Sequence, residues 1–157
     1  MERPRVPQSK PTGGPATPPV TETRIQTILF QGTVAGKNGQ AFIEPVQTIL
    51  AEGFPCQFNL VILSAVTGAP RGMLACTHEL WAEGDLVYKH EHPPTAIAYG
   101  GTGICFRLEL TDLVIGQPCV LTVKVRLSTG TVGQDVPLWV ADKAALQAPQ
   151  PSHQFKA

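Results

Sequence analysis

Alternation of apolar and polar residues along the chain predicts β-strands. Residues 105–110 and 119–127 place apolar side chains at every second position, with polar or charged side chains between them. Residues 24–35 contain a shorter row of the same kind. A period of two is typical of a strand with one buried and one solvated face. These segments therefore predict sheets that cover a hydrophobic core.

A different pattern marks residues 56–66 (CQFNLVILSAV), which form a nearly continuous apolar run. Such a run predicts a central strand that is buried on both faces. The remaining segments with strand character are residues 40–44, 73–83, 86–92, 95–99 and 136–140.

Two dipeptides predict tight turns between strands. Asn38-Gly39 has the residues that a two-residue hairpin turn favours, and Gly84-Asp85 suits the turn of a second hairpin. The second turn predicts three cross-strand pairs, namely Trp81 with Tyr88, Glu79 with His90, and His78 with Glu91.

Helical spacing is confined to two short segments. Residues 45–52 place Val46, Ile49 and Leu50 on one side of a helix, after a proline and before a glycine. At the other end, Asp142 is a suitable cap for one or two helical turns over residues 142–147. We therefore expect at most two short helices.

Seven to nine strands joined by short turns predict an all-β fold with two packed sheets, and a closed small barrel is the alternative. The order of Leu, Gly and an alternating strand in residues 110–125 resembles the corner between strands E and F of fibronectin type III and related immunoglobulin-like domains. Cys119 stands where that family usually has its corner tyrosine. The resemblance implies an immunoglobulin-like antiparallel β-sandwich.

The distribution of proline predicts three parts of the chain. Residues 1–23 contain six prolines and no aromatic residue, a composition that favours an extended arm over a packed domain. The domain itself is expected over residues 24–147, and residues 148–157 are expected to form a short C-terminal tail.

Composition excludes several classes of partner. Twelve basic residues balance twelve acidic ones, so we expect binding to neither nucleic acid nor a membrane. No apolar leader precedes the arm, which predicts no signal peptide. The four cysteines lack the close spacing of a disulfide scaffold. We expect buried free thiols, with a single bridge as the alternative.

One cluster suggests a metal site. Cys76-x-His78 is followed by His90-x-His92, and thiolate and imidazole are ligands that zinc prefers. The predicted hairpin register puts the first pair and the second pair on opposite faces of the sheet, although a bulge would bring them together. We therefore expect surface imidazoles and no cofactor. If a metal did bind, His90, His92 and Glu79 would be its ligands.

No motif predicts catalysis. The four serines lie outside any nucleophile motif, and no cysteine has the setting of an activated nucleophile. The chain is therefore expected not to be an enzyme. Its expected protein-binding residues are those of the cationic, proline-rich arm together with two aromatic side chains: Arg3, Arg5, Pro7, Lys10, Pro11, Pro18, Pro19, Trp81 and Tyr88.

These observations lead to a non-enzymatic structural protein of a larger assembly. In general architecture it is similar to capsid decoration (cement) proteins of tailed bacteriophages, which are small β-rich domains with extended arms. That resemblance implies a virion surface, a major structural subunit as partner, and a homo-oligomer such as a trimer. Without a capsid the expected location is the cytoplasm. The alternatives are an immunoglobulin-like adhesion or ligand-binding module, and a small metal-binding β-sandwich.

Overall fold

The computed structural model describes residues 22–32 and 43–147. The seven arm residues named above, the Asn38-Gly39 turn and the C-terminal tail lie outside this described part of the chain.

Strands make up 69% of the described residues and helix 4%, so the predicted all-β class is confirmed. The strands are β1 (Arg24–Gly32), β2 (Ile43–Pro45), β3 (Thr48–Ala51), β4 (Cys56–Ala69), β5 (Gly72–Leu74), β6 (Cys76–Ala82), β7 (Asp85–Glu91), β8 (Thr95–Ile97), β9 (Thr102–Ile115), β10 (Cys119–Leu127) and β11 (Val136–Asp142). One short helix, α1 (Lys143–Gln147), follows the last strand.

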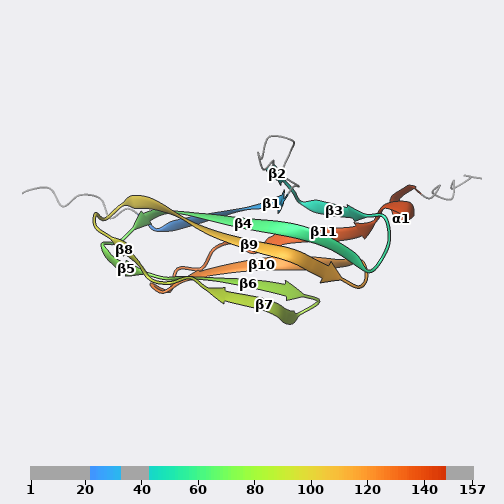
Figure 1. Ribbon diagram of the computed structural model, residues 1–157. Helices are drawn as coiled ribbons and strands as arrows, with labels where there is room; N and C mark the ends of the chain where they lie inside the picture. The colour runs from blue at the N-terminus through green and yellow to red at the C-terminus, as the bar shows by residue number, and fades with distance from the viewer. Residues whose placement is uncertain (1–21, 33–42, 148–157) are drawn as a thin grey trace, which may run out of the picture.

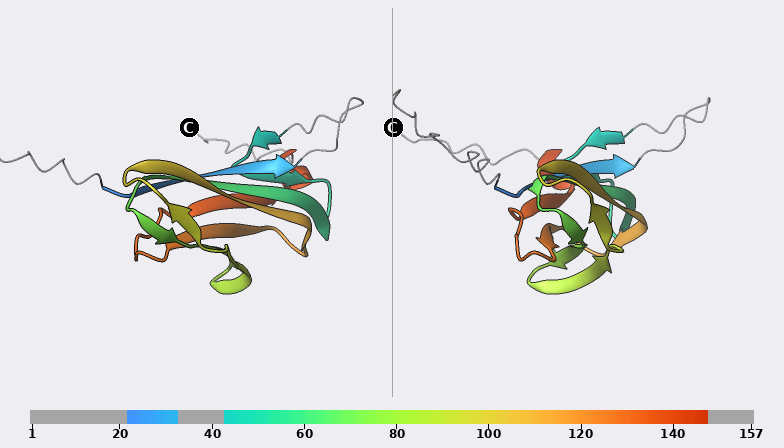
Figure 2. Two further views of the ribbon diagram at one scale, coloured as in Figure 1. Left: turned by 60° about the vertical axis from the view of Figure 1, so that its left-hand side comes forward. Right: turned by 90° about the vertical axis from the view of Figure 1, so that its left-hand side faces the viewer.

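The strands form two main sheets that face each other (Figure 1). One has the order β2-β1-β4-β9 and the other has the order β3-β11-β10-β6-β7. A small third sheet pairs β5 with β8. Figure 2 shows the two layers from the side and from the end. Strands β9 and β7 end their sheets, and no described strand joins the two sheets between them; we call this side of the sandwich its open edge.

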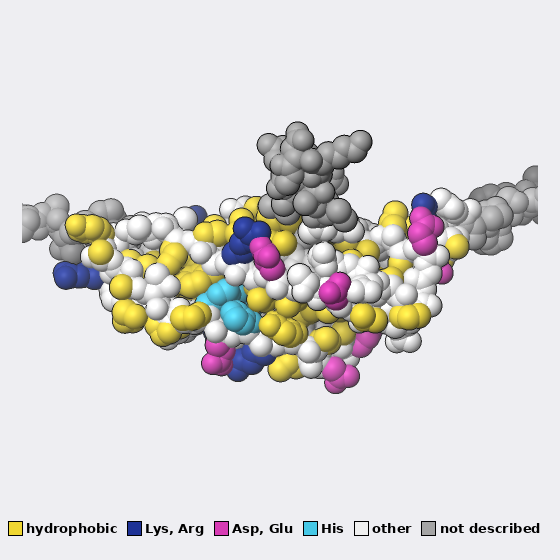
Figure 3. Space-filling model, viewed as in Figure 1, with side chains coloured by type: hydrophobic (Ala, Val, Ile, Leu, Met, Phe, Trp, Pro, Cys, Tyr) yellow, Lys and Arg dark blue, Asp and Glu magenta, His cyan; other side chains and the backbone are white. Residues whose placement is uncertain are grey.

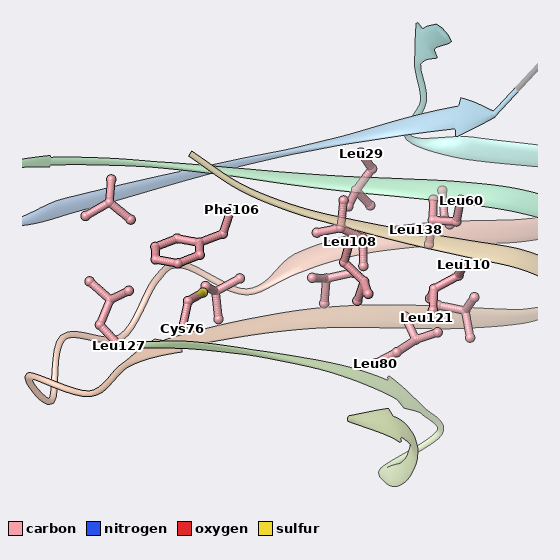
Figure 4. Close-up of a cluster of buried hydrophobic side chains, with 14 of the residues drawn as sticks. Leu29, Leu60, Cys76, Leu80, Phe106, Leu108, Leu110, Leu121, Leu127 and Leu138 are labelled. Carbon is pink, nitrogen blue, oxygen red and sulfur yellow. The ribbon is translucent and has the colours of Figure 1, made fainter. Parts of the chain in front are cut away.

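Side chains from both layers build the core between them (Figure 4). Leu60 and Ile62 of β4 are fully buried, as are Leu121 of β10 and Leu80 of β6. Burying a side chain of this size stabilises the fold by about 1.5–3 kcal/mol. Strand β4 lies between β1 and β9, which confirms the predicted central position. The predicted burial of both faces is wrong, because four residues on the outer face are exposed, namely Gln57, Asn59, Ala65 and Thr67.

The helix predicted over residues 45–52 is wrong. This segment instead contains the ends of β2 and all of β3, and its backbone pairs with both sheets. The amide of Val46 donates to the carbonyl of Leu29, and the carbonyl of Gln47 accepts from the amide of Trp139. Strand β3 then runs parallel to β11. These tertiary hydrogen bonds outweigh a helical spacing that spans only two turns.

The register predicted for the β6–β7 hairpin is also wrong. Its turn is Glu83-Gly84, one residue earlier than predicted, with φ angles of 50° and 86°. A bulge between Leu80 and Trp81 then shifts the register again. The resulting pairs are Trp81 with Leu86, Leu80 with Tyr88, Glu79 with Lys89, and His78 with His90.

The end of the domain agrees with the sequence. Helix α1 begins after Asp142, whose Oδ1 accepts a hydrogen bond of 2.9 Å from the amide of Ala144. All four cysteines are free. The expectation that they are buried holds for Cys76, whereas Cys105 is exposed. Within the described ranges, the structure has no helix with the length and hydropathy of a membrane span.

Candidate functional site

Three histidines gather on the inner face of the β6–β7 hairpin. His78 lies directly opposite His90. His92 follows β7, and its amide donates to the carbonyl of Cys76 at 2.8 Å. The bulge between Leu80 and Trp81 puts these residues on one face, as anticipated from the sequence for a bulged hairpin. In Figure 3 histidine side chains are visible at the surface between hydrophobic patches; His78 is fully buried and is not among those that reach the surface.

The imidazole rings contact one another directly. His78 Nδ1 lies 2.7 Å from His92 Nε2, a hydrogen-bond distance. The rings of His90 and His92 meet edge to face, with centroids 4.5 Å apart. On the other side, His92 packs against Phe106 of β9 at 5.4 Å between centroids. The cluster therefore lies at the open edge between β7 and β9.

A hydroxyl relay supports the cluster from within the core. Ser64 Oγ of β4 lies 2.8 Å from His78 Nε2 of β6, so this hydrogen bond crosses from one sheet to the other. Ser64 Oγ also lies 2.8 Å from Thr27 Oγ1 of β1. Ser64 and His78 are each 0% exposed. Both ring nitrogens of the buried imidazole are thus satisfied.

Burial favours the neutral form of two of these imidazoles. Burial first, and the like charges of His92 and His90 second, lower the pKa of His78 to about 4. The pKa of His92 is lowered by burial and by His90. Neutral imidazole carries the lone pair that a metal ion needs.

Cys76 adds a thiol beside the histidines. Its side chain is 1% exposed, and burial raises its pKa to about 12. Because a thiolate is the form that binds metals and attacks substrates, Cys76 remains a thiol in this apolar setting.

The Ser64–His78 pair has the spacing of a nucleophile and its base. Ser64 has no exposed surface, however, so a substrate cannot reach its hydroxyl. The more suitable chemistry is metal binding by the imidazoles. In the described part of the chain, no group of three or more His, Cys, Asp or Glu side chains is placed to hold a metal ion.

The residues that the sequence suggested for a metal site lie on different faces of the sheet from those predicted. His90 and His92 come together, and His78 joins them although the predicted register had separated it. Glu79 lies on the opposite face, where its Oε2 accepts a hydrogen bond of 3.0 Å from Trp81 Nε1. Glu79 is therefore not a third ligand.

Trp81 and Tyr88, which were expected to form one aromatic contact site, lie on different faces of the sheet. Trp81 lies on the outer face of its sheet with the Lys124 Nζ 5.1 Å from the centre of its ring. Tyr88 is opposite the buried Leu80 and therefore lies on the other face. Sequence reasoning missed Ser64 and Thr27. The one available signal was a serine inside an otherwise apolar central strand.

No family model matches this chain, and no curated protein matches it. Among solved structures, it is similar to the superoxide reductase (neelaredoxin) from Ignicoccus hospitalis, at 13% identity and a TM-score of 0.32, over 62% of this chain and 77% of that chain. A likeness of this size carries neither a fold family nor an activity over to this protein.

Two sequence-based expectations are corrected at this point. The expected capsid decoration protein without enzymatic activity finds no counterpart in this comparison, in which the similar structure is a superoxide reductase. The sequence also did not predict that His78, His90 and His92 form a cluster in which His78 is fully buried. We therefore retain neither the capsid assignment nor the expectation that the chain is not an enzyme.

Proposed function

We propose that this protein is a metal-binding β-sandwich in which His78, His90 and His92 bind a divalent transition-metal ion such as Zn²⁺. The observation that carries this proposal is the position of His78. One ring nitrogen faces His92 at 2.7 Å, while the other is held by Ser64 at 2.8 Å.

The bond between Ser64 and His78 is the support that a metal ligand requires. A histidine ligand almost always hydrogen-bonds through its second ring nitrogen, which fixes its tautomer and its orientation. Here Ser64 supplies that contact, and Thr27 in turn orients Ser64.

The ring nitrogens need a small movement to share an ion. Two ligands at zinc–nitrogen distances of 2.0–2.1 Å in a tetrahedral site lie about 3.3 Å apart, against 2.7 Å between His78 Nδ1 and His92 Nε2. In the metal-free chain a proton occupies the space between these nitrogens. His92 is half-buried at the open edge, so its ring can make this adjustment.

Three imidazoles leave one position of a tetrahedral ion for water or a substrate. Sites with three protein ligands and one open position are typical of catalytic zinc, whereas structural zinc sites are closed by four protein ligands. The open edge between β7 and β9 gives solvent access to that position. This supports a reactive site over a purely structural one.

We also propose that the sandwich is immunoglobulin-like. Its support is the strand order: β1-β4-β9 facing β11-β10-β6-β7 corresponds to strands A-B-E facing G-F-C-C′ of an immunoglobulin-like domain. Strand D has no counterpart among the described strands. In this arrangement His78 lies on strand C, His90 on strand C′ and His92 just beyond strand C′.

Metal titration of the full chain tests the proposed function. The metal-free protein, prepared with a chelator, is titrated with Zn²⁺ by calorimetry and with Co²⁺ by visible absorption, which reports tetrahedral nitrogen ligands. We expect one ion per chain. His90→Gln and His92→Gln should each weaken binding by about tenfold or more.

The fourth histidine offers a matched control. His153→Gln removes an imidazole outside the described residues and should leave the affinity unchanged. Failure of the wild-type chain to bind either metal, or a loss of affinity with His153→Gln equal to that with His92→Gln, would refute the proposed site.

A further inference from the structure

A hollow of about 330 Å³ lies at a second place, at the end of the five-stranded sheet where β10 begins and β11 ends. Strands β10 and β11, helix α1 and the β6–β7 turn surround it. The residues that matter for its chemistry are Trp139, Leu146, Val120, Cys119, Glu83 and Asp142. Its volume is at the lower end of the range of small-molecule sites.

Large apolar side chains of this hollow remain exposed to solvent. Trp139 is 55% exposed and Leu146 is 66% exposed. They come from β11 and from α1, which follows it directly. An indole face beside an aliphatic wall is a surface suited to the apolar body of a ligand.

The charges of the hollow have one sign. Glu83 and Asp142 contribute carboxylates, and no lysine or arginine is among the residues that line it. Asp142 also caps Ala144. Glu83 forms no ion pair with any other described residue. Its negative charge acts on Cys119 in the wall of the hollow, where it adds to burial in raising the pKa of that thiol.

Glu83 occupies a backbone position that disfavours it. Its φ of 50° belongs to the left-handed region, where residues other than glycine, asparagine and aspartate cost about 1–2 kcal/mol. A two-residue turn of this type normally has asparagine or aspartate there. The turn itself therefore does not explain why a glutamate is present at this position. Its carboxylate at the edge of the hollow is consistent with a role in binding.

We propose that this hollow binds a small organic cation, a protonated amine on an aromatic or aliphatic body. The Trp139 face and the Leu146 side chain contact the apolar body, while the ammonium group lies near Glu83. The ring face of Trp139 also attracts a cation. An anion of the same size would meet two carboxylates, and a neutral molecule would gain nothing from them.

Fluorescence titration of the full chain tests this site, because the chain has two tryptophans. In the Trp81→Phe variant, Trp139 is the single emitter. The probes are 2-phenylethylamine, 2-phenylethanol and 3-phenylpropionate, which share an aromatic body and differ in charge. We expect saturable changes with the amine, weaker binding of the alcohol and the weakest binding of the acid.

Removing the charge of Glu83 separates its contribution to binding from that of the apolar contacts with Trp139 and Leu146. Glu83→Gln in the same background should weaken amine binding by about 3–30-fold, in keeping with one lost charge contact, and should leave alcohol binding unchanged. Glu22→Gln at the start of β1 is the matched control and should have no effect. Equal affinity for all three probes, no saturable change with the amine, or an unchanged affinity in Glu83→Gln would overturn the proposal.

Discussion

Ser64 of β4 and His78 of β6 form a 2.8 Å hydrogen bond across the interior of the sandwich. Both side chains are fully buried and are surrounded by an apolar core. Such a pair persists only when its remaining hydrogen-bonding atoms are satisfied. Thr27 satisfies it on one side and His92 on the other. The same contacts thus join the two sheets and hold the candidate metal ligand in place.

Replacing Ser64 with alanine leaves His78 Nε2 without its partner in the core. An unpaired buried polar group costs about 1–3 kcal/mol, and we expect the free energy of unfolding to fall by this amount. Urea denaturation of the metal-free protein measures the change. Ser128→Ala is the control, because Ser128 Oγ accepts an exposed hydrogen bond from the Ala75 amide. If both variants lose the same stability, the buried relay has no special role.

His78 should make the stability of the metal-free protein depend on pH. Its folded-state pKa is about 4, mainly because of burial, against an ordinary value of 6.5. Between these values the unfolded chain binds a proton that the folded chain does not. The contribution is therefore fully present above about pH 6.5 and is lost as the pH falls toward 4.

The lost contribution amounts to about 3 kcal/mol at most. The groups facing His78 are Ser64 from β4 and the imidazoles of His90 and His92. Denaturant unfolding at several pH values, with a chelator present, gives the slope. NMR titration of the His78 ring then assigns it, and a ring that titrates near 6.5 in the folded protein would contradict the prediction.

The cysteines should differ in reactivity. Cys105 is exposed on β9, whereas Cys76 is buried and has a pKa of about 12. We expect a thiol reagent at neutral pH to modify Cys105 first and Cys76 only after unfolding, because the thiolate is the reactive form. Mass spectrometry of the digested protein identifies the sites. Cys105→Ser should remove the fast phase, and early labelling of Cys76 would show that the core opens more readily than expected.

Substitutions of Glu83 in the Glu83-Gly84 turn test whether this residue lowers the free energy of unfolding while it strengthens binding of the amine. Asparagine adopts the φ of this position more easily than glutamate does, so Glu83→Asn should raise the free energy of unfolding by about 0.5–1 kcal/mol. It should also weaken binding of the phenylethylamine probe. Glu83→Gln should weaken binding without the gain in stability, and thermal unfolding of the two variants makes the comparison. A gain in both variants would show that the carboxylate itself destabilises the turn.

The strands were predictable because their signal is local. The alternation in β10 follows from the burial of one face, and the apolar run in β4 indicated a strand inside the sheet; neither signal depends on distant residues. The segment from Pro45 to Ala51 was not predictable in this way. Its apolar spacing fits a helix, and only its hydrogen bonds to Leu29 and Trp139 make it strands.

The candidate site depended on one residue of register. Either turn alone would leave His78 and His90 on opposite faces, because moving the turn by one residue slides the pairing by two residues; the bulge between Leu80 and Trp81 adds the single-residue shift that puts them opposite each other. Since a shift by one residue exchanges the faces of a strand, the sequence motif could not tell a dispersed set of histidines from a cluster.

By itself, then, the sequence determined the all-β class, the central strand and the presence of two His- and Cys-containing segments on neighbouring strands. Only the tertiary structure decided that the imidazoles meet, that Ser64 reaches His78 from the other sheet, and that Trp139 and Glu83 lie around one hollow. The physical reason is that periodicity records which face of a strand is buried, whereas turn geometry, bulges and the packing of two sheets determine which residues share that face.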